Sequence, residues 1–477
     1  SEPALDLENL KTDLIQQIGY QVISRKTVIL VLSVYTLVLV STGIWLGIRQ
    51  KLERLFFIGP ALALLTAFTF FGIGLSNQKS APATVASFQF IQTIEGGNEL
   101  QVDGMSVLYS QENQDFELGA TNDAELKPLR NNPSGELEKT AWQIDGTWNF
   151  AGNKIEPGLE AYRFTSNVPT EKSIVAPAVF GTTGLVGAIN NSFSTSDLED
   201  SILALPSGKN LTVRLNEQKF QLSDDQQLPP GQFIQSNLLT DKQRWRQSIY
   251  QDQFPEDQWE DWVKTPTLFA WSDPIATDIR YPENFRRVGG ALIRIPVILK
   301  KSPPGSQVTI PAAFVGVTNV LNSRNAISPS FNSKSKQWIG SISKETTTRI
   351  RFQLPREVLP LKLESATLSI QSIKALDRIL EIKSGRKTRT NIEKLDNFVG
   401  NLESKITDPE ILVLDQQGGL LIDIDIAVKP EFYARRKEIQ ESGELGPDGK
   451  KKKLELAREE LVGIALTATG TVAAQND

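Results

Sequence analysis

Two uninterrupted apolar stretches near the N-terminus dominate the hydrophobic pattern of the chain. Thr27–Ile48 and Leu55–Asn77 contain no charged side chain, and only the six residues Arg49–Arg54 separate them. A helix of about 20 apolar residues spans the roughly 30 Å hydrocarbon core of a bilayer. The pattern therefore predicts a transmembrane helical hairpin, with the rest of the chain outside the lipid.

A shorter apolar stripe precedes the hairpin. Leu7, Leu10, Leu14, Ile18 and Val22 recur at spacings of three and four residues, which is the period of one helix face. Two placements of this amphipathic helix are open: it packs on the large domain or continues into the membrane helix, or it takes an interfacial position on the lipid surface. The small number of basic residues in the segment favours packing.

Beyond Lys79 the hydrophobic period changes from 3.6 to 2, which is typical of β-strands. Val85–Gln92 and Glu99–Tyr109 flank a glycine-rich turn and predict a β-hairpin. Short strands separated by regular turn signals over residues 174–235 predict a compact β-sandwich. Further strands from Thr265 onward predict a second one.

The predicted fold class is therefore mainly β, with two β-sandwich-like units on the exported side and an N-terminal two-helix transmembrane hairpin as anchor. The expected domains are an amphipathic helix (1–26), the hairpin (27–78), a first β-sandwich-like region (79–235), an aromatic helical insert (236–264) and a second β-sandwich-like region (265–477). Within the last region, we expect residues 431–460 to form a charged helical excursion.

The insert at 236–264 is polar, acidic and rich in aromatic residues, and Pro255 divides it into two short predicted helices. Its rings have two open interpretations: anchors that fix the insert to a sheet, or an exposed face that binds a partner. The candidate partner-binding residues are Trp245, Tyr250, Trp259 and Trp262.

Charge in the hairpin loop predicts the orientation of the protein. The loop Arg49–Arg54 has three basic residues, and the positive-inside rule places it in the cytoplasm. Arg25 and Lys26 favour the opposite orientation, but with two charges against three. We expect an integral membrane protein whose large domain lies on the periplasmic or luminal side.

Composition narrows the chemistry that the chain can perform. It has no cysteine and no histidine, and its net charge is -5. These absences exclude disulfides, thiolate and histidine ligands, and every Ser-His-Asp mechanism. The acidic balance argues against general nucleic-acid binding. We expect a protein that is not an enzyme, with no cofactor, no metal and no catalytic residue.

Several motifs still offer candidate chemistry. Asp423 and Asp425 alternate with isoleucines, so both carboxylates share one face of a strand; they suit a calcium site or an acid pair, or simply a solvated sheet face. Ser365 and Ser369 share a strand face with Thr367, but no activating base can be assigned to them.

Other motifs are more simply structural. The glycine-rich run Gly181–Gly187 lacks the Lys-Ser/Thr pair of a phosphate loop, so tight turning of strands explains it. Asp224-Asp225 and Asp197–Asp200 lack the spacing of a calcium loop and are expected at turns. Two basic loops, 383–389 and 449–453, are expected to be solvated turns, with contact to anionic lipid headgroups as the alternative.

The order of the segments resembles a group of bacterial, including cyanobacterial, membrane proteins with a basic transmembrane hairpin ahead of an exported, immunoglobulin-like β-region. The stretches that carry the resemblance are the hairpin with Arg49–Arg54, then residues 96–120, 184–205 with 228–233, 267–273 and 351–370. The resemblance implies that 184–205 forms an immunoglobulin-like strand pair, and it supplies no catalytic residue. Some members look like auxiliary subunits beside ATP-driven transporters.

These observations favour a membrane-anchored structural or accessory subunit of a membrane complex. Its expected partners are other membrane-complex subunits, including a transporter, and the lipid bilayer. The first alternative is an envelope carbohydrate-binding module that stacks sugars on Trp142, Trp148, Trp259, Trp262 and Trp271. The second is a hydrolase based on Asp and Glu, for which the sequence does not single out a carboxylate pair.

Overall fold

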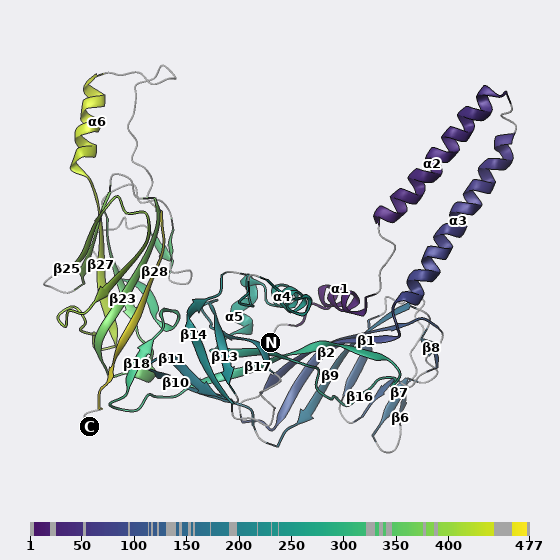
Figure 1. The fold of residues 1–477 in the computed structure, drawn as a ribbon. Helices are drawn as coiled ribbons and strands as arrows, with labels where there is room; N and C mark the ends of the chain where they lie inside the picture. Colours follow the sequence, from purple (N-terminus) through teal and green to yellow (C-terminus); the bar gives the residue numbers. More distant parts are fainter. Residues whose placement is uncertain are drawn as a thin grey trace. The chain divides into compact units, whose positions relative to one another are not determined.

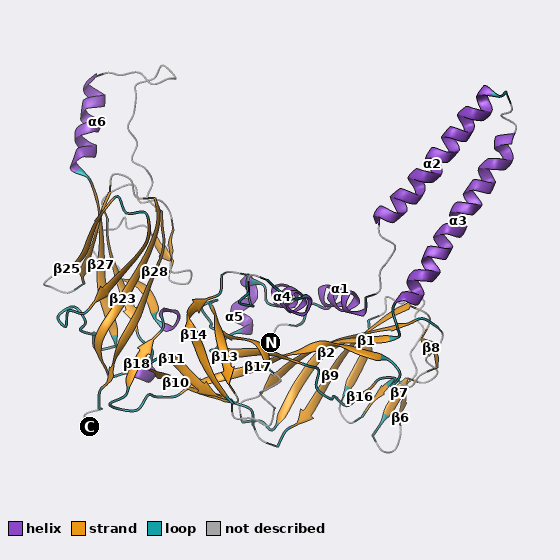
Figure 2. Cartoon of the chain, in the orientation of Figure 1, coloured by secondary structure: helices purple, strands orange, loops and turns teal. Residues whose placement is uncertain are grey.

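The chain adopts a mainly β fold, with 46% of its residues in strands, a seven-stranded barrel, further sheets and two apolar N-terminal helices (Figures 1 and 2). This confirms the coarser part of the predicted fold class. The computed structural model describes residues 4–19, 25–50, 54–93, 96–112, 114–115, 118–121, 124–129, 140–142, 146–150, 154–155, 158–171, 173–189, 198–216, 218–229, 231–236, 238–320, 330–332, 337–339, 346–374, 378–385, 390–442 and 460–474.

Contacts divide the chain into two compact units that are not contiguous in sequence. Unit 1 comprises Ser1–Ser173, Asn237–Pro255 and Ala270–Arg294, and unit 2 comprises Ile174–Ser236, Glu256–Phe269 and Ile295–Asp477. These units do not coincide with the expected boundaries at residues 235 and 264. The reason is that strands far apart in sequence pair with one another, which a pattern read along the chain does not reveal.

Helix α1 (Leu7–Ile18) is amphipathic and packs on unit 1. The Asp6 side chain accepts hydrogen bonds from the first backbone N–H groups, and Gly19 ends the helix in the left-handed region at φ 77°. Leu10, Leu14 and Ile18 are buried, and the helix contacts β1, β2 and α4. Packing on the domain, the first of the two predicted placements, is thereby confirmed.

The predicted hairpin forms two long helices, α2 (Arg25–Ile48) and α3 (Leu55–Ser80), that pack against each other. Two spans within them are long and apolar enough to cross a membrane: Thr27–Ile48 with mean hydropathy 2.2, and Leu55–Gly74 with mean hydropathy 2.0. An 18-residue apolar window in each span contains no buried residue, whereas Leu46, near the end of the first span, is 2% exposed.

Some threonine hydroxyls inside the spans are satisfied within their own helix. Thr36 donates to the Leu32 carbonyl at 2.8 Å, and Thr66 donates to the Leu62 carbonyl at 2.9 Å. This pairing matters in hydrocarbon, where an unsatisfied polar group costs several kcal/mol.

The sheet of unit 1 has the order β17-β1-β2-β9-β5, with β1 and β17 parallel and the other pairs antiparallel. The predicted hairpin is confirmed as β1 and β2, with Phe88 opposite Met105. Gly289 in β17 has φ 131°, and a Cβ there would lie 1.8 Å from the Ser87 carbonyl oxygen, so only glycine allows this pairing. The bounds are β1 (Thr84–Thr93), β2 (Glu99–Ser110), β5 (Glu125–Pro128), β9 (Gly158–Pro169) and β17 (Arg286–Leu299).

Two small sheets complete the strands of unit 1, with orders β16-β4-β7-β6 and β3-β8. Their bounds are β3 (Gln114–Asp115), β4 (Gly119–Ala120), β6 (Thr140–Trp142), β7 (Trp148–Phe150), β8 (Lys154–Ile155) and β16 (Ile279–Arg280).

The insert forms helices on both sides of Pro255, as predicted. Helix α4 (Asp241–Gln253) belongs to unit 1 and begins with a capping box between Thr240 and Gln243. In unit 2, η3 (Glu256–Gln258) leads into the short helix α5 (Trp259–Trp262).

Residues 174–235 form most of a seven-stranded barrel, and the predicted β-sandwich there is wrong. The order is β10-β11-β14-β13-β12-β15-β17, and parallel pairing of Ala176 with Val297 joins β10 to β17 and closes the ring. The closing strand comes from far along the chain, which explains the error. The bounds are β10 (Ala176–Gly181), β11 (Gly184–Ala188), β12 (Glu199–Ala204), β13 (Asn210–Asn216), β14 (Lys219–Gln227) and β15 (Thr267–Ser272).

The barrel order also corrects the implied immunoglobulin-like strand pair. Strands β11 and β12, which both lie within residues 184–205, do not pair with each other, because β14 and β13 lie between them in the sheet.

The C-terminal part of unit 2 contains a four-stranded sheet, β18-β28-β23-β26, and a five-stranded sheet, β19-β22-β27-β24-β25. The bounds are β18 (Gln307–Ile310), β19 (Gly316–Val320), β22 (Thr346–Gln353), β23 (Leu361–Lys374), β24 (Arg378–Ser384), β25 (Asn391–Asp396), β26 (Gly400–Ile406), β27 (Gly419–Val428) and β28 (Glu460–Val472). The short elements are η4 (Ala312–Phe314), η5 (Arg356–Val358) and the pair β20 (Ser330–Asn332) and β21 (Gln337–Ile339).

Helix α6 (Pro430–Ser442) occupies the start of the predicted charged excursion. The rest of that excursion lies outside the described residues, as do loop 449–453 and residues 386–389 of the other basic loop.

Candidate functional site

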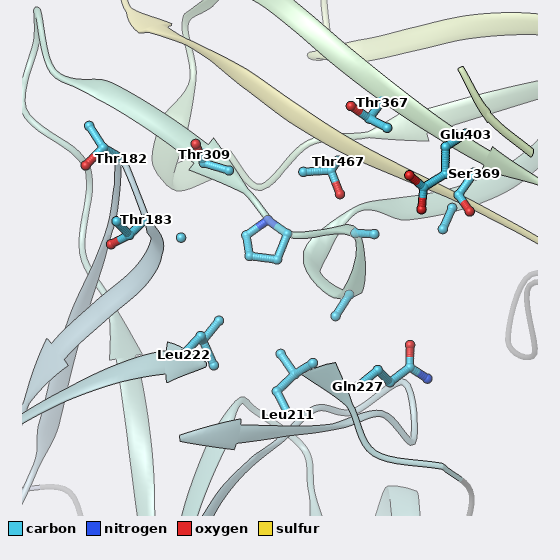
Figure 3. Close-up of a pocket in the computed structure, with 15 residues that line it drawn as sticks. Thr182, Thr183, Leu211, Leu222, Gln227, Thr309, Thr367, Ser369, Glu403 and Thr467 are labelled. Carbon is cyan, nitrogen blue, oxygen red and sulfur yellow. The ribbon is translucent and has the colours of Figure 1, made fainter. Parts of the chain in front are cut away.

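A cleft of about 550 Å³ lies within unit 2 and is the candidate functional site (Figure 3). Hydroxyl groups dominate its polar lining. The polar side chains that line it are those of Thr182, Thr183, Thr309, Thr367, Ser369 and Thr467, together with Gln227 and Glu403. Alanine, leucine, proline and glycine residues supply the remaining lining.

Strand alternation positions one wall of the cleft. Thr367 and Ser369 lie two residues apart on β23 and therefore share one sheet face, whereas the intervening Leu368 is buried on the other. Neighbouring strands extend this wall, because Thr367 pairs with Thr467 of β28 and Ser369 pairs with Glu403 of β26. Backbone ladders thus fix the relative positions of these side chains.

Barrel residues provide the opposite wall, where Leu211 of β13 and Leu222 of β14 face the cleft (Figure 3). The tight turn between β10 and β11 adds Thr182 and Thr183. This turn needs a glycine, because Gly184 has φ 96°. The structural explanation of the glycine-rich run is therefore confirmed.

Several hydroxyls of the cleft are free to bind a ligand. Thr183 accepts a hydrogen bond from Gln221 at 2.9 Å. Within the described part of the chain, the hydroxyls of Thr367, Ser369 and Thr467 have no hydrogen-bond partner, and these residues are half-exposed. Ser365 lies on the same face of β23 as Thr367 and Ser369, as the sequence predicts.

The predicted exposed aromatic face is not found, because the rings of the insert are buried. Trp245 is 6% exposed and Tyr250 is 1% exposed. Both pack on Trp271 in unit 1, with ring centroids 5.4 Å and 5.7 Å away. They anchor α4 to the sheet, which was the alternative interpretation.

The two tryptophans of the second helix are also buried. Trp259 is 5% exposed, packs on Phe233 and donates its Nε1–H to the Leu205 carbonyl at 2.9 Å. Trp262 is 2% exposed. The strongly apolar area of a tryptophan ring favours such burial over exposure to water.

Tryptophans proposed for sugar stacking are likewise inside the protein. Trp148 is 5% exposed and Trp271 is fully buried. The side chain of Trp142, the fifth candidate, lies outside the described part of the structure. The four described rings offer no exposed stacking platform.

Asp423 and Asp425 do share one strand face, but basic side chains neutralise them. Arg349 binds Asp423 through two hydrogen bonds of 2.6 Å and 2.8 Å, and Lys383 binds Asp425 at 2.8 Å. Hydrogen bonding to Asp423 raises the pKa of Arg349, and hydrogen bonding to Asp425 raises that of Lys383. Both carboxylates are thus used in ion pairs, which argues against an acid pair.

The ion pairs continue along the same sheet. Lys383 also contacts Glu381 at 2.6 Å, Lys394 contacts Glu381 at 3.0 Å, and Arg351 binds Asp415 at 2.8 Å and 3.0 Å. The bond from Lys383 lowers the pKa of Glu381, and the bond from Arg351 lowers that of Asp415. Among the described residues, no group of three or more acidic side chains is arranged to hold a metal ion.

Two further acidic motifs, Asp224-Asp225 and Asp197–Asp200, were expected at turns. Asp224-Asp225 lies within β14 and not at a turn, because that strand continues to Gln227. Asp200, the second residue of β12, lies in the left-handed region at φ 44°, and Asp197 lies outside the described residues.

Comparisons with known proteins identify no family for this chain. No family model matches it, and no curated protein does so either. Among solved structures, a low-affinity xylan-binding module from Roseburia intestinalis is 13% identical, with a TM-score of 0.18, over 35% of this chain and 97% of that one. SGBP-B of a Bacteroides ovatus mixed-linkage glucan utilization locus, in complex with a mixed-linkage heptasaccharide, is 9% identical, with a TM-score of 0.13, over 81% of this chain and 89% of that one. An infectious bursal disease virus structure is 10% identical, with a TM-score of 0.17, over 83% and 73%.

Proposed function

We propose that this protein is a membrane-anchored, non-enzymatic accessory subunit of a membrane complex, with its β-rich units on the periplasmic or luminal side. The hairpin carries this proposal. Its two spans are apolar on all sides, and each contains an 18-residue apolar window in which the protein buries no residue. A helix that is apolar all round is stable where lipid or another membrane helix covers it.

Side chains of α2 and α3 support a membrane setting. Phe57, Leu64 and Phe68 of α3 are between 61% and 75% exposed, and such rings and chains are costly to leave in water. At the loop end of α2, the Arg49 guanidinium lies 4.2 Å from the centre of the Trp45 ring. Trp and Arg are common at the boundary between lipid and water.

The ion pairing of the acidic groups supports the proposal that the protein is not an enzyme. The carboxylates that the sequence singles out on β27 are ion-paired, and an ion-paired carboxylate is a poor general acid or base. The hydroxyl of Ser369 faces the cleft without a hydrogen-bonded base in the described part of the chain.

A co-purification experiment tests the accessory role. The full chain with a C-terminal tag is extracted from native membranes in mild detergent, and the bound proteins are identified by mass spectrometry. The matched control keeps Arg49–Arg54 and replaces the two spans by polyleucine of equal length. We expect a stoichiometric membrane protein with the natural chain and its loss with the control. Recovery of the bait alone under all gentle conditions contradicts the proposal.

The orientation can be tested with single cysteines, because the chain has none of its own. Gln50 lies at the hairpin loop and Lys405 lies on β26, and both are exposed. We expect a membrane-impermeant maleimide to label Lys405→Cys in intact cells with a permeable outer envelope, and Gln50→Cys only after lysis. The reverse pattern contradicts the proposed orientation.

A further inference from the structure

We infer that the hydroxyl-lined cleft of unit 2 binds a neutral oligosaccharide. The inference rests on the chemistry of the cleft and does not depend on the accessory role or on the hairpin, because every lining residue belongs to unit 2. It also does not use the buried tryptophans.

Charge limits what the cleft accepts. Glu403 is the only ionisable side chain among the described residues that line it, and it is exposed. Without a lysine or arginine in this lining, an anionic ligand gains no ion pair and meets one repelling carboxylate. A cationic ligand gains only a single solvent-exposed pair, which contributes about 0–1 kcal/mol. The lining therefore favours an uncharged ligand.

Hydrogen-bonding capacity points to a ligand rich in hydroxyl groups. A serine or threonine hydroxyl both donates and accepts, and rotates to suit its partner. Thr367, Ser369 and Thr467 have no hydrogen-bond partner within the described part of the chain, so a ligand competes with water alone for them. The Glu403 carboxylate adds strong acceptors for ligand O–H groups.

The two walls of the cleft match the two kinds of surface on a sugar ring. Leu211 and Leu222 lie across the cleft from Thr367 and Ser369 (Figure 3). A sugar ring presents C–H groups on a face and hydroxyls around its edge. Among the apolar lining residues, Ala312 and Ala313 keep partial exposure and suit the first, whereas Leu211 and Leu222 are 5% and 7% exposed and add little contact area. The hydroxyl wall suits the second, and apolar contact with few polar groups is usual in ligand sites.

Size and rigidity agree with this assignment. The volume of about 550 Å³ falls within the range of roughly 300–1,000 Å³ that ligand sites occupy. The hydroxyls are held on paired strands, with Thr367 opposite Thr467, so ordering them costs little on binding.

Calorimetric titration of the detergent-solubilised full chain tests the inference. The neutral probes are xylotriose, cellotriose and maltotriose; the charged probes are trigalacturonate and trilysine. We expect at least one neutral trisaccharide to bind and neither charged probe to bind as tightly. Absence of binding by all three neutral probes, or tighter binding of a charged probe, overturns the inference.

Matched variants locate the binding. We expect Thr367→Val with Thr467→Val, which keep the side-chain shape, to weaken the neutral ligand about tenfold, since two hydrogen bonds are lost. Glu403→Gln serves as a second variant, with an expected loss of several-fold. Thr471→Val is the control, because Thr471 lies on the same strand outside the cleft and donates to Glu364. Equal affinity of the double variant and the control overturns the inference. An unchanged melting temperature shows that each variant is folded.

Discussion

Two sheets in the C-terminal part of unit 2 expose polar faces of opposite character. On the five-stranded sheet, Arg349, Asp423, Lys383 and Asp425 bind one another across β22, β27 and β24. On the four-stranded sheet, the hydroxyls of Thr367, Ser369 and Thr467 have no hydrogen-bond partner in the described chain. Both faces follow from the same alternation of polar and apolar residues.

The comparison teaches that a polar strand face becomes a binding site only when its groups are not already used. On the charged face, each carboxylate has a basic neighbour, so the face holds the sheet together and has little left to offer a ligand. On the hydroxyl face, donors and acceptors remain available. The following changes break or sharpen this contrast, from the largest expected effect to the smallest.

Removing the most buried carboxylate of the charged face should have the largest effect. Asp423 is 1% exposed and carries both hydrogen bonds from Arg349. Asp423→Ala leaves that guanidinium without its partner, which should lower the free energy of unfolding by about 3 kcal/mol. Urea unfolding of the detergent-solubilised chain measures this loss.

A matched double variant separates pairing from shape. Arg349→Met with Asp423→Leu replaces the pair by apolar groups and should restore most of the lost stability. A double variant as unstable as Asp423→Ala would show that the pair does more than neutralise charge.

Asp13 in unit 1 is a carboxylate without a basic partner in the described chain, in contrast to the ion-paired carboxylates of the five-stranded sheet. The pKa of Asp13 on α1 is raised to about 6, mainly by burial; the hydrogen bond from Ser248 at 3.1 Å opposes the shift, and the charge of Asp252 adds to it. Because the folded pKa exceeds the ordinary 3.8, the contribution of Asp13 to α1 packing is fully present below pH 3.8 and is lost as the pH rises to about 6.

Asp13→Asn should therefore slow amide hydrogen exchange in α1 at pH 8, with a gain of about 1 kcal/mol, and abolish the pH dependence between 4 and 6. Glu8→Gln, at an exposed position of the same helix, is the control and should leave that dependence intact. An unchanged pH profile in Asp13→Asn would contradict this assignment.

Acid should weaken the charged face but not the hydroxyl face. The Arg351 bond holds the pKa of Asp415 below 3.8, and the Lys383 bond holds the pKa of Glu381 below 4.5. Since both folded values are depressed, the stability that these groups contribute is present above about pH 5 and is lost as the pH falls through the folded values.

Asp415→Asn should cost about 1 kcal/mol at pH 7 and less at pH 2.5, because acid favours the protonated side chain, which does not form the same ion pair in the natural chain. Thermal unfolding at the two pH values measures the difference. An equal loss at both would assign the role of Asp415 to its bonds with the Gln417 and Gly419 backbone N–H groups, at 2.9 Å and 2.8 Å, and not to its charge.

The hydroxyl face should be the least sensitive to substitution. Thr367→Val and Thr467→Val remove half-exposed hydroxyls that have no partner in the described chain, so the free energy of unfolding should change by less than about 0.5 kcal/mol. A loss comparable to that of Asp423→Ala would show that these hydroxyls are structural.

Much of the secondary structure could be predicted from local patterns. The apolar spans predict α2 and α3, and the alternation over Val85–Gln92 and Leu420–Val428 predicts β1 and β27. Local sequence is ambiguous where an apolar run is short: Ile411–Leu414 has the apolar residues of a strand, but Ile411 lies in a turn and donates its N–H to the Asp408 carbonyl. The charged strand β25 (Asn391–Asp396) was missed, because an edge strand with a polar surface lacks a clear apolar alternation.

The candidate site was less accessible to sequence reasoning. Ser365, Thr367 and Ser369 were visible as a polar strand face, but their partners Thr467 and Glu403 lie about 100 and 34 residues further on. The aromatic residues of the insert attracted attention as a surface, yet nothing local tells whether a ring faces solvent or another element.

The sequence by itself determined the properties that depend on neighbours along the chain: two spans apolar enough for a membrane, the period of the strands, and a chemistry without cysteine or histidine. Tertiary structure alone decided the closure of the barrel through Ala176 and Val297, the burial of Trp245 on Trp271, and the use of Asp423 by Arg349. Helical and strand periods are set by backbone geometry within a few residues. Pairing, burial and neutralisation depend on which distant segments meet, and that is decided by packing of the whole chain.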